Sequence, residues 1–183
     1  MNNLKVELKE KIEYAIENKI GKVLMFIKDE HNILAVKEYL NEKGGGIELI
    51  GVTFPANEKM YEYNKEDDKV VPFVPDASNG DKVRDLLEKK NVKLISGTMP
   101  FEGIVIPGEN YNPYKIVEQT LSLVHPALPN LVQTVLTATD FGVVLPKERV
   151  LVINAVLGIE TIGTNSRLLF HPEEGLEIHN ILT

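Results

Sequence analysis

Small hydroxyl-bearing residues and glycines follow several of the strands that the sequence predicts, and such residues can bind an anionic or flat ligand. With one apolar neighbour they form a set of seven candidate ligand-binding residues: Thr53, Ser96, Gly97, Thr98, Met99, Gly158 and Thr161. Backbone N–H groups, hydroxyl groups and an apolar wall together suit a phosphorylated or flavin-like molecule. The alternative is that Ser, Thr and Gly stand there because turns and helix caps favour them.

Two familiar phosphate-binding motifs are incomplete or missing. Residues 158–164 have the outer glycine spacing of a P-loop, but no Lys stands before Thr164 and a strand is predicted to follow. Without that Lys, little would hold the β- and γ-phosphates of a nucleotide. No G-x-G-x-x-G run follows a predicted strand. The sequence therefore argues against a nucleotide triphosphatase and against a standard dinucleotide site.

Residues typical of a catalytic or metal centre show no recognisable spacing. The chain has no cysteine and no G-x-S-x-G run, which argues against thiol and serine nucleophiles. The four histidines, His31, His125, His171 and His179, lack the spacing of metal ligands. An enzyme that uses Asp140, Glu160 or His171 together with a bound cofactor is retained as an alternative, and no metal is expected.

The composition indicates one globular domain of the cytoplasm. The 183 residues carry 20 Lys and Arg against 27 Asp and Glu, a net charge of −7, and 43% are hydrophobic. No long basic run is present, so partners with phosphate backbones or anionic membranes are not expected. The first residues carry acids and no apolar run, so we expect no signal peptide. We expect a single domain over residues 1–183, with residues 1–20 as its leading helix.

Helical and strand periodicities alternate along the chain. Helices are predicted over residues 4–20, 33–40, 83–87, 113–124 and 128–139, and strands over 22–27, 47–53, 92–96 and 149–156. Residues 54–69 are predicted to be an irregular surface excursion, followed by an extended segment at 70–74. Residues 165–170 and 176–182 are predicted to form an antiparallel hairpin. This order predicts a three-layer α/β/α fold with a mostly parallel sheet of about five strands and an antiparallel final strand.

The region from Gln119 to Thr139 contains no Asp, Glu, Lys or Arg. Prolines and polar residues interrupt it, so two helices buried in protein are favoured over a membrane span. This uncharged stretch, which spans parts of two short helices, is longer than one sheet face needs. We therefore predict a homo-oligomer that buries part of this stretch.

The chain resembles the carboxy-terminal α/β domain of pyruvate kinase in its stand-alone archaeal and bacterial form. The residues that carry the resemblance are SGT at 96–98, ATDFGVVLP at 138–146, VLVINA at 150–155, GIET at 158–161 and LEIHNIL at 176–182. It covers roughly residues 21–182. The resemblance implies a three-layer fold with the last strand antiparallel, in agreement with the periodicities.

The same resemblance implies what the chain does not do. Pyruvate kinase performs its chemistry in a barrel domain that this chain lacks, so no pyruvate kinase activity is expected. The effector-phosphate loop of the family corresponds to residues 28–32, which read KDEHN here. Its carboxylates would repel a phosphate, so that site is not carried over. Stand-alone relatives accept a flavin-like ligand at the strand ends, which makes FMN the candidate cofactor.

The sequence thus predicts a small-molecule-binding domain whose ligand lies at the carboxyl ends of the strands. No reaction is assigned to it. The alternatives are the cofactor-dependent enzyme named above and a structural or regulatory subunit of an oligomer.

Overall fold

The computed structural model describes residues 4–44, 46–56, 58–64, 69–78, 81–101 and 112–183. Its main sheet contains β1 (Lys22–Phe26), β2 (Glu48–Thr53), β5 (Lys93–Ser96), β6 (Arg149–Ile153), β7 (Gly158–Ile162) and β8 (Ile178–Leu182). The helices are α1 (Val6–Glu17), α2 (His31–Lys43), α3 (Asp81–Lys89), α4 (Pro113–Val124) and α5 (Leu128–Asp140). Two short 3₁₀ helices, η1 (Asp76–Ser78) and η2 (Ser166–Leu168), and a separate hairpin of β3 (Met60–Asn64) and β4 (Lys69–Phe73) complete the elements.

The strand order is β5-β2-β1-β6-β7-β8, and the first four of these strands are parallel. Direction reverses at β7 and again at β8, because both pair antiparallel with their neighbours. The α/β fold with a mostly parallel sheet is therefore confirmed, with six strands in the main sheet. Along the chain the sheet grows outward from β1 to β2 and β5, and then returns to the other side of β1 with β6. The space between the carboxyl ends of β1 and β6 is thus the topological switch point of the sheet.

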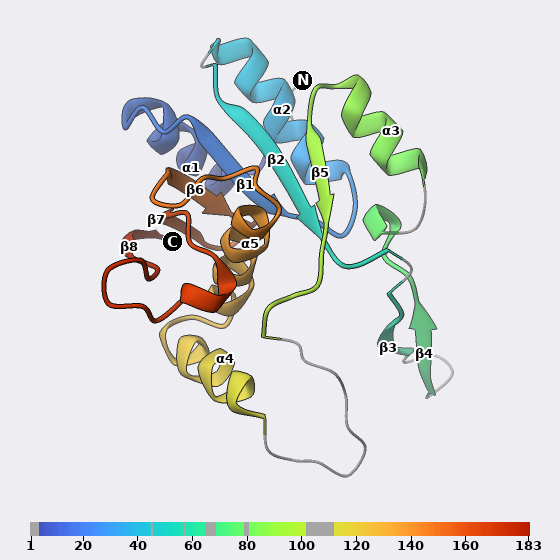
Figure 1. The fold of residues 1–183 in the computed structure, drawn as a ribbon. Coiled ribbons are helices and arrows are strands. Elements are labelled where there is room, and N and C mark those ends of the chain that lie inside the picture. The colour runs from blue at the N-terminus through green and yellow to red at the C-terminus, as the bar shows by residue number, and fades with distance from the viewer. Residues whose placement is uncertain (1–3, 45, 57, 65–68, 79–80, 102–111) are drawn as a thin grey trace.

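Helices cover both faces of the sheet (Figure 1). Successive residues of a strand point to opposite faces, so Val23 and Met25 pack with α1 and α2 while Leu24 packs with α5. Almost every residue of α5 is buried, whereas no residue of α4 is. The prediction of two buried helices therefore holds for α5 and is wrong for α4, which lies outside α5. None of the helices in the described part of the chain has the length and apolar character that a bilayer crossing requires.

Three local predictions need correction. Within the predicted irregular excursion, residues 60–64 form β3, which pairs with β4 from Met60–Phe73 to Asn64–Lys69. The sequence places residues 158–162 beyond the end of a strand, but they form β7. Ile159, Thr161 and Ile162 favour a strand. The turn after β6 comes earlier, where the Asn154 side chain accepts the Leu157 N–H. Residues 166–168 form the 3₁₀ helix η2 and no strand. In the terminal hairpin β8 therefore pairs with β7, not with residues 165–170.

Candidate functional site

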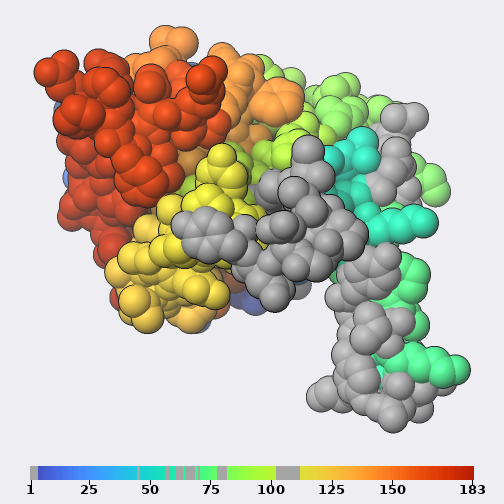
Figure 2. Space-filling view, turned by 60° about the horizontal axis from the view of Figure 1, so that its bottom comes forward, coloured from blue at the N-terminus to red at the C-terminus, as the bar shows by residue number. Residues whose placement is uncertain are grey.

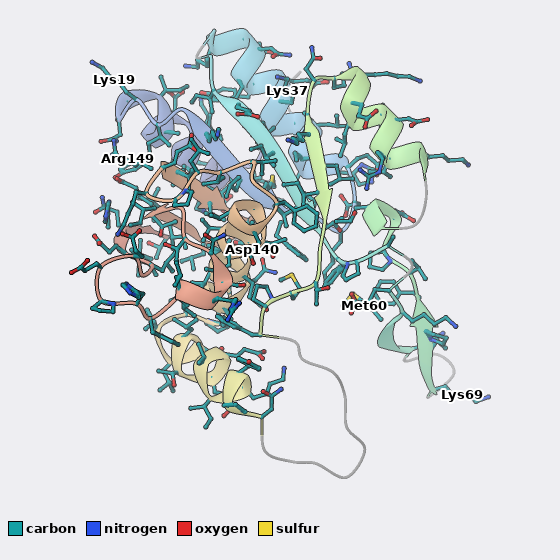
Figure 3. All side chains as sticks on the ribbon, viewed as in Figure 1. Lys19, Lys37, Met60, Lys69, Asp140 and Arg149 are labelled. Carbon is teal, nitrogen blue, oxygen red and sulfur yellow. The ribbon has the colours of Figure 1, made fainter. Side chains whose placement is uncertain are left out.

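A cavity of about 620 Å³ lies at the switch point of the sheet. Its walls come from the carboxyl ends of β1 and β6, from the segments after β2 and β5, and from the first turns of α2 and α5. Helix α4 contributes Glu118 and Ser122 to the lining, and strand β3 contributes Met60. Figure 3 places Met60 at the start of β3, where the hairpin leaves the body of the molecule. A site that is shared by this many elements needs the whole fold to form it.

One part of the cavity wall is apolar and contains sulfur and aromatic rings. Its members are Met25, Phe26, Ile27, Phe54, Met60 and Met99. The rings of Phe26 and Phe54 meet edge to face, with centroids 4.8 Å apart and planes at 88°. Flexible methionine side chains adapt to a guest, and fixed aromatic rings favour a flat one. This wall therefore suits a planar ring system.

The other part of the wall is polar and rich in amides. Its members are Lys28, Asp29, Asn32, Glu118, Ser122, Asn130, Gln133 and Asn154. The Asp29 carboxylate accepts the N–H of His31 at 2.9 Å and so caps the start of α2. The N-termini of α2 and α5 bring partial positive charge to the cavity, and Lys28 adds a full one. Asp29 and Glu118 oppose this charge, so the site has no one-sided preference for an anion.

Two of these amides have a fixed orientation. The Oε1 of Gln133 accepts the backbone N–H of Phe101 at 2.7 Å. The Oδ1 of Asn154 accepts the N–H groups of Val156 at 3.0 Å and Leu157 at 2.8 Å. A backbone N–H can only donate, so in both side chains the oxygen must face the backbone. No described residue accepts a hydrogen bond from either amide nitrogen, and both residues line the cavity.

Met99 is the one residue of the predicted set that lines this cavity. The hydroxyl of Thr53 is buried and donates to the Ile27 carbonyl at 2.8 Å, which ties the end of β2 to β1. Ser96 accepts a hydrogen bond from Arg84 at 3.1 Å, and Thr98 is exposed. These residues lie at the predicted edge of the sheet, but the hydroxyl groups of Thr53 and Ser96 form hydrogen bonds within the fold there.

The three remaining predictions fall into two places. A Cβ on Gly97 would come within 2.7 Å of both Thr137 and the Phe141 ring, so this glycine allows α5 to approach β5. Gly158 begins β7 opposite Ile153, beside the side chains of Lys11 and Leu182. Thr161 lies opposite Val150, near the other end of the sheet, and its hydroxyl donates to Glu177 at 2.7 Å. Gly97 is close to Met99 in the chain, but neither it nor Gly158 nor Thr161 lines the cavity.

The residues of the alternative catalytic set also lie apart. The carboxylate of Asp140 accepts hydrogen bonds from the Asn165 side chain and the Ser166 backbone. The Nδ1 of His171 accepts two backbone N–H groups of its own turn. Glu160 is buried within β7, where Arg149 above all, and also Tyr14, lower its pKa to about 2. Figure 3 shows Asp140 and Arg149 well separated from Met60 at the cavity.

The cavity residues that sequence reasoning missed carry a weak signal. Asn130 and Gln133 are polar residues within the apolar stripe of α5. Asn154 is a polar residue inside the predicted strand 149–156 and the first residue after β6. A buried amide in an apolar helix needs a partner, which marks Gln133 as unusual. Within the described residues, no three His, Asp or Glu side chains gather as metal ligands.

Comparison with protein-family models gives no match for this chain, and comparison with curated proteins gives no significant match.

Proposed function

We propose that this chain binds a flat, ring-containing small molecule in the switch-point cavity, with a flavin such as FMN as the candidate ligand. The observation that carries the proposal is the cavity itself: about 620 Å³, at the edge of the sheet where α/β folds place their ligands. This volume lies within the range typical of sites for small ligands, roughly 300–1,000 Å³. One wall offers the rings of Phe26 and Phe54, and the opposite side offers amide groups for hydrogen bonds.

The resemblance to the pyruvate kinase carboxy-terminal domain supports the same proposal, because its stand-alone members accept a flavin-like ligand at strand ends. Phosphoryl transfer is not part of the proposal, and no reaction is assigned. The mixture of Lys28 with Asp29 and Glu118 makes the ring system, rather than the phosphate, the main determinant of affinity. Riboflavin should therefore bind nearly as well as FMN.

The test begins with freshly purified protein, its visible absorbance and mass spectrometry of the molecules that heat denaturation releases. Thermal unfolding is then measured with FMN, riboflavin and inorganic phosphate. We expect the two flavins to raise Tm and phosphate alone to leave it unchanged. A colourless protein that releases no ring compound and that neither flavin stabilises would contradict the proposal.

A matched pair of variants locates the binding. Ala155→Phe places a ring inside the cavity and should abolish the flavin-induced rise in Tm. Ala35→Phe, on α2 and outside the cavity lining, makes the same change and should retain it. If the flavin-induced rise in Tm is the same in both variants, the ligand binds outside this cavity.

We also propose that the chain forms a homo-oligomer through the outward face of α4. The side chains of Ile116, Leu123 and Val124 are exposed, Leu123 to 87%. Phe170, 77% exposed, and Leu168 line a second hollow together with α4. Apolar surface of this extent on a helix is typical of an interface. The sequence assigned part of the stretch from Gln119 to Thr139 to an interface. Because α5 is buried against the sheet, only the α4 part of that stretch is proposed as the interface.

Light scattering at micromolar concentration tests the oligomer. Leu123→Lys should shift the chain toward a monomer, since a charge would be buried without a partner. Val6→Lys, a similarly exposed apolar residue of α1, is the control and should leave the mass unchanged. A monomeric parent protein would refute this proposal.

A further inference from the structure

Two side chains that line the switch-point cavity have an amide nitrogen available as a hydrogen-bond donor. Gln133 is 5% exposed, and its Nε2 donates to no atom in the described part of the chain. The Nδ2 of Asn154 likewise has no acceptor among the described residues. Neither nitrogen is among the fully buried atoms of the described residues that lack a partner, and Asn154 is partly exposed, so both donors can be reached from the cavity. A ligand in the cavity can therefore supply the acceptors for both of them.

The fold prevents these amides from turning their oxygens into the cavity. A flip of Gln133 would set its NH₂ group against the Phe101 N–H, donor against donor. A flip of Asn154 would lose two backbone hydrogen bonds at once, those of Val156 and Leu157. The Phe101 N–H is buried, so the flip of Gln133 would leave a buried donor unpaired, whereas the two bonds of Asn154 are exposed or partly buried. Both side chains are thus donors toward the cavity and cannot become acceptors.

Resting on the proposed function, we propose that Gln133 and Asn154 are the specificity-determining residues of this site, and that they select planar heterocycles with ring carbonyl oxygens. A ring carbonyl accepts one or two hydrogen bonds and lies in the plane of the ring. The ring itself would rest against Phe26, Phe54 and the methionines. A planar ring of the same size without carbonyl acceptors would fill the apolar part of the cavity but leave both donors unpaired. Sites built to hydrogen-bond a group reject analogues that lack it far more strongly than apolar pockets do.

The isosteric acids separate this role from a structural one. Gln133→Glu and Asn154→Asp keep the oxygens that accept from Phe101, Val156 and Leu157. Each replaces the NH₂ donor with a second acceptor oxygen, which repels a ligand carbonyl. Stability should change little for Asn154→Asp, which is partly exposed, and should fall for Gln133→Glu, whose carboxylate is nearly buried. Affinity for a carbonyl-bearing ring should fall at least tenfold for each variant. Asn41→Asp, an exposed residue in the last turn of α2, introduces the same charge outside the cavity as the control.

The experiment measures dissociation constants by fluorescence titration of riboflavin and lumichrome, which carry ring carbonyls, and of acridine, a three-ring heteroaromatic compound without carbonyls. The proposal expects both carbonyl compounds to bind the parent protein at least tenfold more tightly than acridine does. It expects Gln133→Glu and Asn154→Asp to remove this preference, with Asn41→Asp like the parent. Far-UV circular dichroism and Tm show that each variant is folded.

Three outcomes are distinguishable. Loss of the preference in both cavity variants supports the assignment. Tight binding of riboflavin that neither substitution weakens, or equal affinity of the parent for acridine, overturns the assignment and leaves the proposed ring-binding function intact. If none of the three compounds binds the parent, the proposed function fails, and the selection of carbonyls fails with it.

Discussion

Glu160 is a buried carboxylate whose charge the fold keeps. Its side chain is 4% exposed, and Oε1 lies 2.5 Å from the Nε of Arg149. The hydroxyl of Tyr14 and the amide of Asn180 donate to Oε2 at 2.5 Å and 3.0 Å. Arg149 is the largest cause that lowers the pKa of Glu160 from 4.5 to about 2, and burial opposes the shift. The network therefore stabilises the ionised form in the middle of β7.

The depressed pKa of Glu160 predicts acid sensitivity. Because the folded state binds this proton less readily than the unfolded chain, the stabilisation is present above pH 4.5 and is lost as the pH falls toward about 2. Because Arg149 is half-exposed and solvent screens its charge, the full loss in the free energy of unfolding is about 2–3 kcal/mol. Denaturant unfolding at pH 6 and pH 3 should show part of this loss in the parent protein, since pH 3 is still above the folded-state pKa, and a smaller change in Glu160→Gln. Equal losses in the two proteins would contradict this assignment, and exposed Glu17→Gln is the control.

Lys11 is a buried amine in α1 whose Nζ has no hydrogen-bond partner among the described residues. Burial lowers the pKa of Lys11 below its ordinary 10.5, while Glu7 and Glu10 oppose the shift. The unfolded chain therefore holds this proton more firmly, and the destabilisation from Lys11 diminishes as the pH rises toward 10.5.

An apolar side chain of similar length should relieve that cost. Lys11→Met is expected to stabilise the fold by about 1 kcal/mol, which raises Tm by roughly 2–4 °C at neutral pH. The gain should shrink in alkaline buffer, as calorimetry at two pH values can show. Lys9→Met, an exposed position of the same helix, should change Tm little. A lower Tm for Lys11→Met would mean that the amine has a favourable partner.

At the scale of elements, Gly97 sets how closely α5 approaches the end of β5. A Cβ there would come within 2.7 Å of Thr137, which is buried, and of the Phe141 ring, which is exposed. Gly97→Ala should therefore destabilise the fold by about 1–3 kcal/mol through overpacking. Phe141→Ala should recover part of that loss in the double variant, because one of the two contacts is removed. Denaturant unfolding of the four proteins measures the coupling, and strict additivity would argue against this packing role.

The same contact changes what a ligand experiment with Gly97 would mean. Sequence analysis placed this glycine among the candidate ligand-binding residues. In the fold its neighbours are α5 side chains, so a weaker ligand affinity in Gly97→Val would have displaced packing as its first cause. Substitutions at Gln133 and Asn154 are the direct tests.

At the scale of the whole molecule, the β3–β4 hairpin is an appendage of the main body. Its two strands pair with each other and not with the six-stranded sheet, and the hairpin projects from the body in Figure 2. Met60 and Phe73 are paired at its base, so a short linker can join the chain on either side. Among the β3 and β4 residues whose side chains the structure describes, Met60 alone lines the cavity.

Removal of the hairpin should therefore affect binding more than stability. Replacement of residues 58–73 by a short Gly/Ser linker should leave the free energy of unfolding within about 1 kcal/mol of the parent value, because the sheet and both cores remain. Affinity for riboflavin should fall several-fold as the Met60 wall is lost, and Met60→Ala in the intact chain should reproduce most of that change. A deletion protein that unfolds without cooperativity would show that the hairpin supports the core.

The four parallel strands could be predicted because strands covered on both faces carry continuous apolar runs, as residues 22–27 and 149–153 do. Strand β3 was missed because its Tyr-Glu-Tyr sequence, outside the main sheet, has no such run. The edge of the sheet that holds the cavity was predicted from topology, but its amides were not. Which face of α5 meets the cavity depends on how α4 and α5 pack, and local periodicity does not contain that information.

The central strand has a consequence for how the protein is made. Met25 of β1 pairs with Gly51 of β2 and also with Ile153 of β6, which is synthesised 128 positions later. On the ribosome, β1, β2 and β5 can assemble while β6 is still untranslated. The cavity does not exist during that interval, because Asn154 and Ala155 form one of its sides. The proposed ligand could therefore bind only after β6 and the residues that follow it have been made, and it would then stabilise the contact between the early and the late parts of the chain.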